Sequence, residues 1–250
     1  MVEAVDKKDR DRRSGLIDSL RGVLVISMIL YHGMYDLVYL FGMEAPWFHG
    51  TAGFLWQQIT CCIFILLSGF CSALGKQTAK RGVVVLLWGT LVSLVTLIVM
   101  PEQRVLFGVL MLIGSCMILV GAAKALWERI PAAAGMIAFG LLFLLSRRIN
   151  EGVIGIGSRT LFEVPAGLYR NNLTAYLGFP HEAFFSTDYF SIIPWLFLFL
   201  SGFFLFRLWG RKLLSCQWKG ILPLNWIGRH ALILYVLHQP LLYGVLQLFY

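Results

Sequence analysis

LIDSLRGVLVISMILYHGMYDLVYLF, residues 16–41, is an apolar stretch long enough to cross a lipid bilayer, and it contains four ionisable side chains. A membrane-spanning helix needs about 20 mostly apolar residues, and an ionisable side chain inside one costs at least about 2.5 kcal/mol. The stretch therefore predicts a transmembrane helix whose ionisable residues serve a function. These residues are Asp18, Arg21, His32 and Asp36.

The four side chains share one face of the predicted helix. At about 100° per residue, His32 lies roughly 20° from Arg21, and Asp18 and Asp36 both lie roughly 60° from it. Arg21 and His32 are separated by about 16 Å along the axis, at 1.5 Å per residue. One end of this face is therefore basic, and the other carries a proton-transfer group. We interpret the face as one wall of a site that the rest of the chain encloses.

The composition is that of an integral membrane protein. Of the 250 residues, 58% are hydrophobic and only 14% are charged, against about 25% charged in soluble proteins. The apolar segments do not alternate with period two, which favours helices over a β-barrel. We expect a charged cytosolic tail over residues 1–15 and a single transmembrane domain over residues 16–250, in contact with membrane lipids.

Seven apolar segments predict an all-α bundle of about seven transmembrane helices. They cover approximately residues 16–41, 51–74, 82–100, 105–123, 132–145, 190–208 and 226–249. The first segment lacks a small-residue cleavage site, so it should remain as an anchor. Residues 146–189 are polar, glycine-rich and aromatic, which predicts an ordered loop with a short re-entrant or interfacial helix.

The basic residues predict the orientation. If the N-terminus is cytosolic, the inner side collects all but five of the 21 Lys and Arg residues, as the positive-inside rule requires. The five on the outer side are Arg104, Arg147, Arg148, Arg159 and Arg170. If the segment 132–145 were re-entrant, the 146–189 loop would change sides. The net charge of +8 thus reflects topology, and no basic patch with interleaved exposed aromatics indicates a nucleic-acid partner.

Other predicted spans also carry polar groups. Gln57 and Ser68 lie on one face of the second span, where Ser68 could simply allow close helix approach. His238 and Gln239 lie near the middle of the last span, and Pro240 frees a backbone carbonyl there. Two histidines on two helices, His32 and His238, are a stronger sign of a site than either would be alone.

Several kinds of chemistry lack their motifs. His32 and Asp36 have i, i+4 spacing, but no HExxH motif or zinc-spaced cysteine pair accompanies them, so we predict no metal. Ser68 lacks the G-x-S-x-G elbow of serine hydrolases. The glycine-rich residues 152–159 precede no phosphate-binding βα unit. The five cysteines are best explained as packing residues.

The motifs resemble a known family. Asp18-x-x-Arg21-Gly22 followed by Tyr31-His32 resembles the first helix of transmembrane acyltransferases that modify surface sugars. Phe64-x-x-x-Ser68-Gly69-Phe70 and Tyr235-x-x-His238-Gln239-Pro240 look like other segments of that superfamily. Residues 18–36 and 188–195 are most similar to bacterial relatives of heparan-alpha-glucosaminide N-acetyltransferase.

This resemblance implies a multi-pass enzyme of the bacterial cell (inner) membrane. The donor would be cytosolic acetyl-CoA or another acyl-CoA, and the acceptor a glycan or amino sugar at the outer face. Arg21, with Asp18, is implied to engage the donor, and His32 is implied to be catalytic. Homo-oligomerisation and the choice between N- and O-acylation stay open.

The residues themselves agree with acyl transfer. His32, oriented by Asp36 or by a neighbouring helix, can act as general base or can carry the acyl group transiently. Gln57 or His238 could stabilise an oxyanion. The alternative function is a proton-coupled transporter or flippase of a small solute or lipid-linked sugar. No inverted repeat between the two halves supports it.

Overall fold

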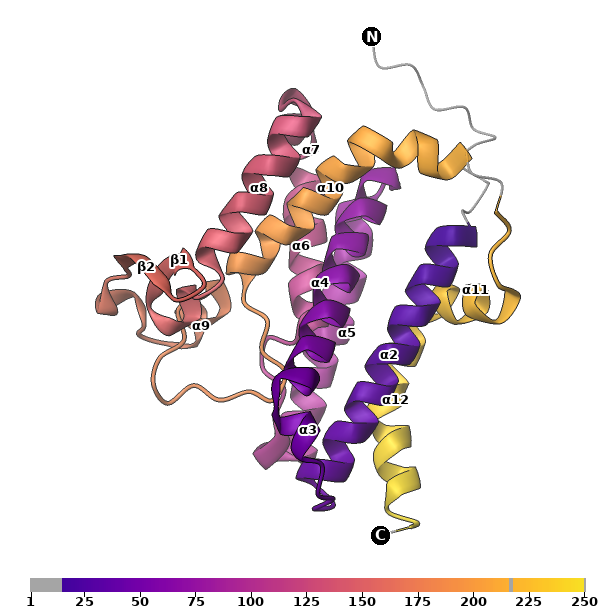
Figure 1. Ribbon diagram of the computed structural model, residues 1–250, viewed down its shortest axis with the longest axis vertical. Coiled ribbons are helices and arrows are strands. Elements are labelled where there is room, and N and C mark those ends of the chain that lie inside the picture. Colours follow the sequence, from indigo (N-terminus) through magenta and orange to yellow (C-terminus); the bar gives the residue numbers. More distant parts are fainter. Residues whose placement is uncertain (1–14, 216–217, 250) are drawn as a thin grey trace. The chain divides into compact units, whose positions relative to one another are not determined.

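The computed structural model describes residues 15–215 and 218–249 of the chain. These residues are mostly helical, with one two-stranded sheet among them (Figure 1). The predicted helical membrane fold is therefore confirmed in outline. The charged tail predicted over residues 1–15 falls, except for Gly15, outside the described residues, and its cytosolic placement stays a prediction.

The helices and strands have the following bounds. The α-helices are α2 (Gly15–Tyr39), α3 (Pro46–His49), α4 (Thr51–Leu74), α5 (Thr78–Val99), α6 (Val109–Ala122), α7 (Lys124–Arg129), α8 (Ala132–Ser146), α9 (Asn172–Leu177), α10 (Ile192–Ser215), α11 (Leu222–Arg229) and α12 (Ala231–Leu246). Short 3-10 helices cover Pro101–Gln103, Ile149–Glu151 and Ala166–Leu168, and the strands are β1 (Val153–Ile156) and β2 (Arg159–Glu163).

Five helical segments among the described residues are long and apolar enough to cross a membrane. They are Gly15–Tyr39, Thr51–Leu74, Thr78–Val99, Ala132–Glu151 and Ile192–Gly210. The helices α6 and α12 are apolar but shorter. The structure thus supports a multi-pass membrane protein, while the predicted count of seven spans and the N-terminal orientation stay predictions.

The helix α6 begins later than the sequence predicted. Phe107 has a positive φ of 58°, and the chain before Val109 pairs with the end of the long loop instead of continuing as a helix. Leu106 N donates to Ser186 Oγ at 2.9 Å, and Phe190 N donates to Phe107 O at 2.9 Å. Val109 N donates to Asp188 Oδ2 at 3.3 Å, so a carboxylate from the loop satisfies one backbone donor at the start of α6.

The prediction of one continuous last span over residues 226–249 is wrong. The helix α11 ends at Arg229, and α12 begins at Ala231. Arg229 at the end of α11 forms an ion pair with Asp18 of α2. Burying a guanidinium group in a membrane costs free energy unless an acidic side chain pairs with it. Here the helix ends directly after Arg229, at the position where this ion pair forms.

The described chain divides into two compact units, which we describe separately. The first comprises the N-terminal part through Phe64 and the C-terminal part from Arg211, and the second comprises Ile65–Gly210. The boundaries fall inside α4 and α10. The single transmembrane domain expected over residues 16–250 stays a prediction.

In the first unit, α2 packs against both α11 and α12. Glycines allow the approach to α11: a Cβ added at Gly22 would lie 2.2 Å from Leu224 O, and one at Gly228 would lie 1.9 Å from Asp18 O. Ser19 Oγ donates to Asn225 Oδ1 at 2.7 Å in the same contact. Gly22 of the first-span motif is therefore needed because the α11 backbone touches it.

In the second unit, glycines also bring helices into backbone contact. A Cβ at Gly69 of α4 would lie 1.9 Å from Phe199 O, and one at Gly202 of α10 would lie 2.0 Å from Leu66 O. This geometry agrees with the alternative that small residues around Ser68 allow close helix approach. The helices α5 and α6 pack on each other, and Leu112 and Phe204 are among the buried core residues of the unit.

The long loop after α8 is ordered, as predicted, and contains the short helix α9. Asn171 caps α9 by accepting from Thr174 N at 3.0 Å. The antiparallel β1–β2 hairpin was not predicted. Its turn contains Gly157 at φ 57°, a conformation that favours glycine. The glycines of residues 152–159 thus form a hairpin.

Candidate functional site

Asp18 lies between two arginines at the N-terminal end of α2. Its side chain is buried (residue exposure 4%). Arg21 Nη1 donates to Asp18 Oδ1 at 3.3 Å, and Arg229 Nε donates to Asp18 Oδ2 at 3.0 Å. Arg21 Nη1 also lies 3.4 Å from the carbonyl oxygen of Gly228. Among the described residues, two guanidinium groups thus pair with one carboxylate.

The sequence prediction included Arg21 and Asp18 but missed Arg229. The side chains of Arg21 and Arg229 are 26% and 44% exposed, so part of each guanidinium remains accessible to an anion. The sequence signal for Arg229 was a charged residue directly after Gly228 within an apolar segment. Arginine in this setting is suited to bidentate recognition of phosphate or carboxylate.

His32 and His238 face each other in the first unit. Their ring centroids are 4.8 Å apart, with an interplanar angle of 62°. His238 Nδ1 lies 2.5 Å from Tyr235 O. Because a carbonyl only accepts, Nδ1 must carry the proton, and Nε2 of a neutral His238 is then an acceptor. The helix period and the structure thus bring both predicted histidines to one place.

Asp36 is fully buried, with 0% exposure. Gln239 Nε2 donates to Asp36 Oδ1 at 2.8 Å and to Oδ2 at 3.0 Å. Among the described residues, no hydrogen bond joins Asp36 to His32, so the idea that Asp36 fixes the His32 tautomer directly is not what the structure shows. Gln239 Oε1 is buried and has no hydrogen-bond partner within the described part of the chain.

Aromatic side chains from three elements surround Tyr31, next to His32. The Tyr31 ring lies 5.2 Å from Phe48 of α3, 5.5 Å from Trp56 of α4 and 6.0 Å from His32, between centroids. Trp56 Nε1 donates to Ser27 Oγ at 2.9 Å. This contact fixes the first turns of α4 against α2, and no motif in the sequence predicts it.

The two remaining predicted residues lie on α4. Gln57 belongs to the first unit, is half-buried, and makes no hydrogen bond to another described residue. Ser68 belongs to the second unit and is half-buried there. Of the predicted supporting residues, the structure therefore brings His238 and Gln239 to His32 and Asp36.

Within residues 15–215 and 218–249, no group of three or more His, Cys, Asp or Glu side chains is arranged to hold a metal ion.

The described chain thus has the features of a multi-pass helical membrane protein with an acid–base cluster on its first long helix. A family model described as "Heparan-alpha-glucosaminide N-acetyltransferase, catalytic" matches residues 13–240. This match covers most of the chain, so the chain belongs to that family and is a membrane acetyltransferase. The family resemblance seen in the first-span motif is confirmed. No curated protein and no solved structure matches the chain.

Proposed function

We propose that this protein transfers an acetyl or other acyl group from cytosolic acyl-CoA to an amine or hydroxyl of a sugar at the outer face of the membrane. The observation that carries the proposal is the pairing of His32 with His238 next to the buried Asp36–Gln239 contact. All four residues lie within the match to the acetyltransferase family. Acid–base groups are placed there at the cost of burying polar atoms, which is typical of catalytic sites.

In the proposed reaction, the acceptor nitrogen or oxygen attacks the thioester carbonyl carbon. The new C–N or C–O bond forms as the C–S bond breaks. The acceptor's proton passes to His32 and then to the departing thiolate, so His32 is regenerated and CoA leaves as a thiol. If the acyl group instead passes through His32, an acyl-histidine accumulates when the acceptor is withheld.

The other side chains have supporting roles in this proposal. Asp36 and Gln239 hold α12 against α2 and so position the two histidines. A neutral His238 uses its N–H on Tyr235 O, so it has none left for an oxyanion. Gln57 is the other side chain predicted for that contact, although the structure does not bring it to His32.

The Asp18 cluster is the proposed donor site. Its two arginine side chains suit the phosphates of CoA, because the guanidinium fork binds phosphate oxygens in pairs. Arg21 and His32 are separated by about 16 Å along the α2 axis at 1.5 Å per residue. CoA likewise carries its thioester at the end of a long pantetheine arm, away from its phosphates.

The proposal includes the predicted placement in the membrane. The asymmetry of lysine and arginine supports a cytosolic N-terminus, and a bacterial inner membrane is the setting that the resemblance implies. Donor and acceptor would then reach His32 from opposite faces, and the acyl group would cross the membrane without free passage of CoA.

The test is transfer by the purified chain from acetyl-CoA to a panel of amino sugars and glycans. Loss of a general base typically costs 10²- to 10⁴-fold in rate, so His32→Ala should lose most turnover while keeping its acetyl-CoA affinity and its melting behaviour. His238→Ala is the comparison, since loss of its helix contact should reduce stability as well. If His32→Ala keeps its turnover, or loses it only in proportion to unfolding, the transporter function becomes the better explanation.

A further inference from the structure

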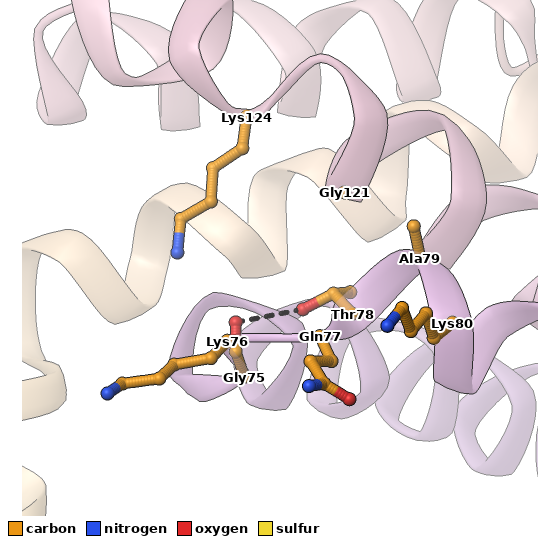
Figure 2. A pocket seen from close by; sticks show the side chains of 8 residues that line it. All are labelled: Gly75, Lys76, Gln77, Thr78, Ala79, Lys80, Gly121 and Lys124. Atoms are coloured by element: carbon orange, nitrogen blue, oxygen red, sulfur yellow. Dashed lines mark hydrogen bonds between the residues drawn. The ribbon is translucent and has the colours of Figure 1, made fainter.

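A hollow of about 230 Å³ lies in the second unit, where the turn between α4 and α5 faces the turn between α6 and α7. We call it the lysine hollow because Lys76, Lys80 and Lys124 line it, together with Gly75, Gln77 and Gly121 among others (Figure 2). Its volume is well above the roughly 30 Å³ that one water takes up in the liquid. The hollow is therefore large enough for a small hydrated anionic group.

The charges around the hollow are mainly positive. Among residues 15–215 and 218–249, no Asp or Glu lines it. Outside the lining, Glu128 Oε1 lies 3.9 Å from Lys124 Nζ, and both of these side chains are about half exposed. Three lysines thus line one hollow, and within the described part of the chain the one carboxylate paired with any of them is that of Glu128. Mutual repulsion of the lysines is relieved when an anion binds between them.

Local packing sets the two turns that form the hollow, and the start of α5 adds to its positive potential. A Cβ at Gly121 would lie 2.6 Å from Ala79 N, so this glycine lets the end of α6 approach the start of α5. Thr78 Oγ1 donates to Ser72 O at 2.8 Å and to Gly75 O at 3.1 Å, which caps α4. The first turn of α5 has no side-chain cap and no acidic residue, so its N–H dipoles act in the same direction as the lysines.

We propose that the lysine hollow binds a phosphate group, supplied either by an anionic phospholipid headgroup or by CoA. Phosphate offers several strong acceptor oxygens to the three lysines, and its charge matches their surplus. Both turns lie on the side that the charge asymmetry predicts to be cytosolic, where anionic lipids and CoA are both present. The CoA source rests on the proposed acyl-CoA dependence, whereas the lipid source does not.

The experiment uses the full chain in nanodiscs and a triple variant, Lys76→Gln, Lys80→Gln and Lys124→Gln. Its matched control is Arg81→Gln, Arg129→Gln and Lys212→Gln, which removes the same charge from exposed positions outside the hollow. Because each basic residue near an anionic surface adds to the affinity, the triple variant should lose on the order of 100-fold in affinity for its phosphate source.

Two readings distinguish the sources. Native mass spectrometry measures retention of phosphatidylglycerol against phosphatidylcholine, and calorimetry measures the affinity for acetyl-CoA against its 3′-dephospho analogue. Preferential loss of phosphatidylglycerol identifies the lipid, and loss of the preference for the 3′-phosphate identifies CoA. If the triple variant matches its control in both measurements, the lysine hollow is a solvated basic surface and the proposal is wrong.

Glu128→Gln gives a second test, because its expected result is tighter binding and unfolding of the variant cannot produce that result. It removes the carboxylate beside Lys124 and should therefore tighten binding of the same phosphate source by a few fold. An unchanged or weaker affinity in folded Glu128→Gln would contradict the proposal. Phosphatidylglycerol binding without any acetyl transfer would leave the proposal standing while the proposed function fails.

Discussion

Replacing Gln239 with methionine keeps the length of the side chain but removes both hydrogen bonds to Asp36. The carboxylate is fully buried, and Nε2 of Gln239 contacts its oxygens at 2.8 and 3.0 Å. A hydrogen bond to a charged group contributes about 1.5–3 kcal/mol, and both contacts here come from one nitrogen, so their sum is less than additive. We expect Gln239→Met to lower the free energy of unfolding by about 2–4 kcal/mol.

The assay is reversible unfolding in detergent, with Gln247→Met as the matched control. Gln247 ends the same helix, and its Nε2 donates to Tyr243 OH at 2.9 Å in an exposed position. Loss of such a surface contact should cost no more than about 0.5 kcal/mol. In an Asp36→Asn background, Gln239→Met should cost only about 1 kcal/mol, because a neutral amide is cheaper to leave without its partner. Equal stability of the Gln239 and Gln247 variants would refute the reasoning.

Three further predictions concern the donor site, the topology and the second unit. Arg21→Ala should weaken acetyl-CoA binding by about 1.5–3 kcal/mol. Arg21→Lys should keep only part of the affinity, because lysine lacks the planar fork. An unchanged calorimetric affinity in folded Arg21→Ala would exclude Arg21 from the donor site. An impermeant thiol reagent should label Ser158→Cys from the outer face and spare Ser14→Cys, and the reverse pattern would invert the topology. Arg207 donates to the carbonyls of Trp127, Glu128 and Ile130 at 2.7–3.0 Å. Arg207→Lys should therefore lower the free energy of unfolding by about 1–3 kcal/mol. A thermal melting curve like that of the natural chain would show that these hydrogen bonds contribute nothing to stability.

Length and hydropathy predicted most of the long helices because the bilayer sets both. The bounds of α4 match the predicted span 51–74, and α2 differs from 16–41 by one or two residues at each end. The start of α6 was missed because it depends on Ser186 and Asp188, about 80 residues away in the chain. The β1–β2 hairpin was missed because its glycines weaken the strand pattern.

The sequence also predicted which side chains share one face of α2, because an α-helix repeats every 3.6 residues. Its partners were not predictable, because the period says nothing about which distant side chain arrives on that face. Asp36 pairs with Gln239 and Asp18 pairs with Arg229, at separations of 203 and 211 residues. Arg229 was counted only as a charge that sets the topology, although it completes the cluster around Asp18.

The joining of α2 to α11 and α12 has a consequence for biogenesis. The ribosome delivers α2, with its own Asp18–Arg21 pair, to the membrane long before it makes Arg229, the second partner of Asp18, and Gln239, which holds Asp36. During that interval the nascent first span has to be tolerated by the insertion machinery, with its carboxylates exposed to lipid or shielded by a chaperone. Helices made later therefore complete α2, and a ribosome that stalls before α11 leaves a membrane-inserted product that quality-control proteases can recognise by its buried Asp36 without Gln239.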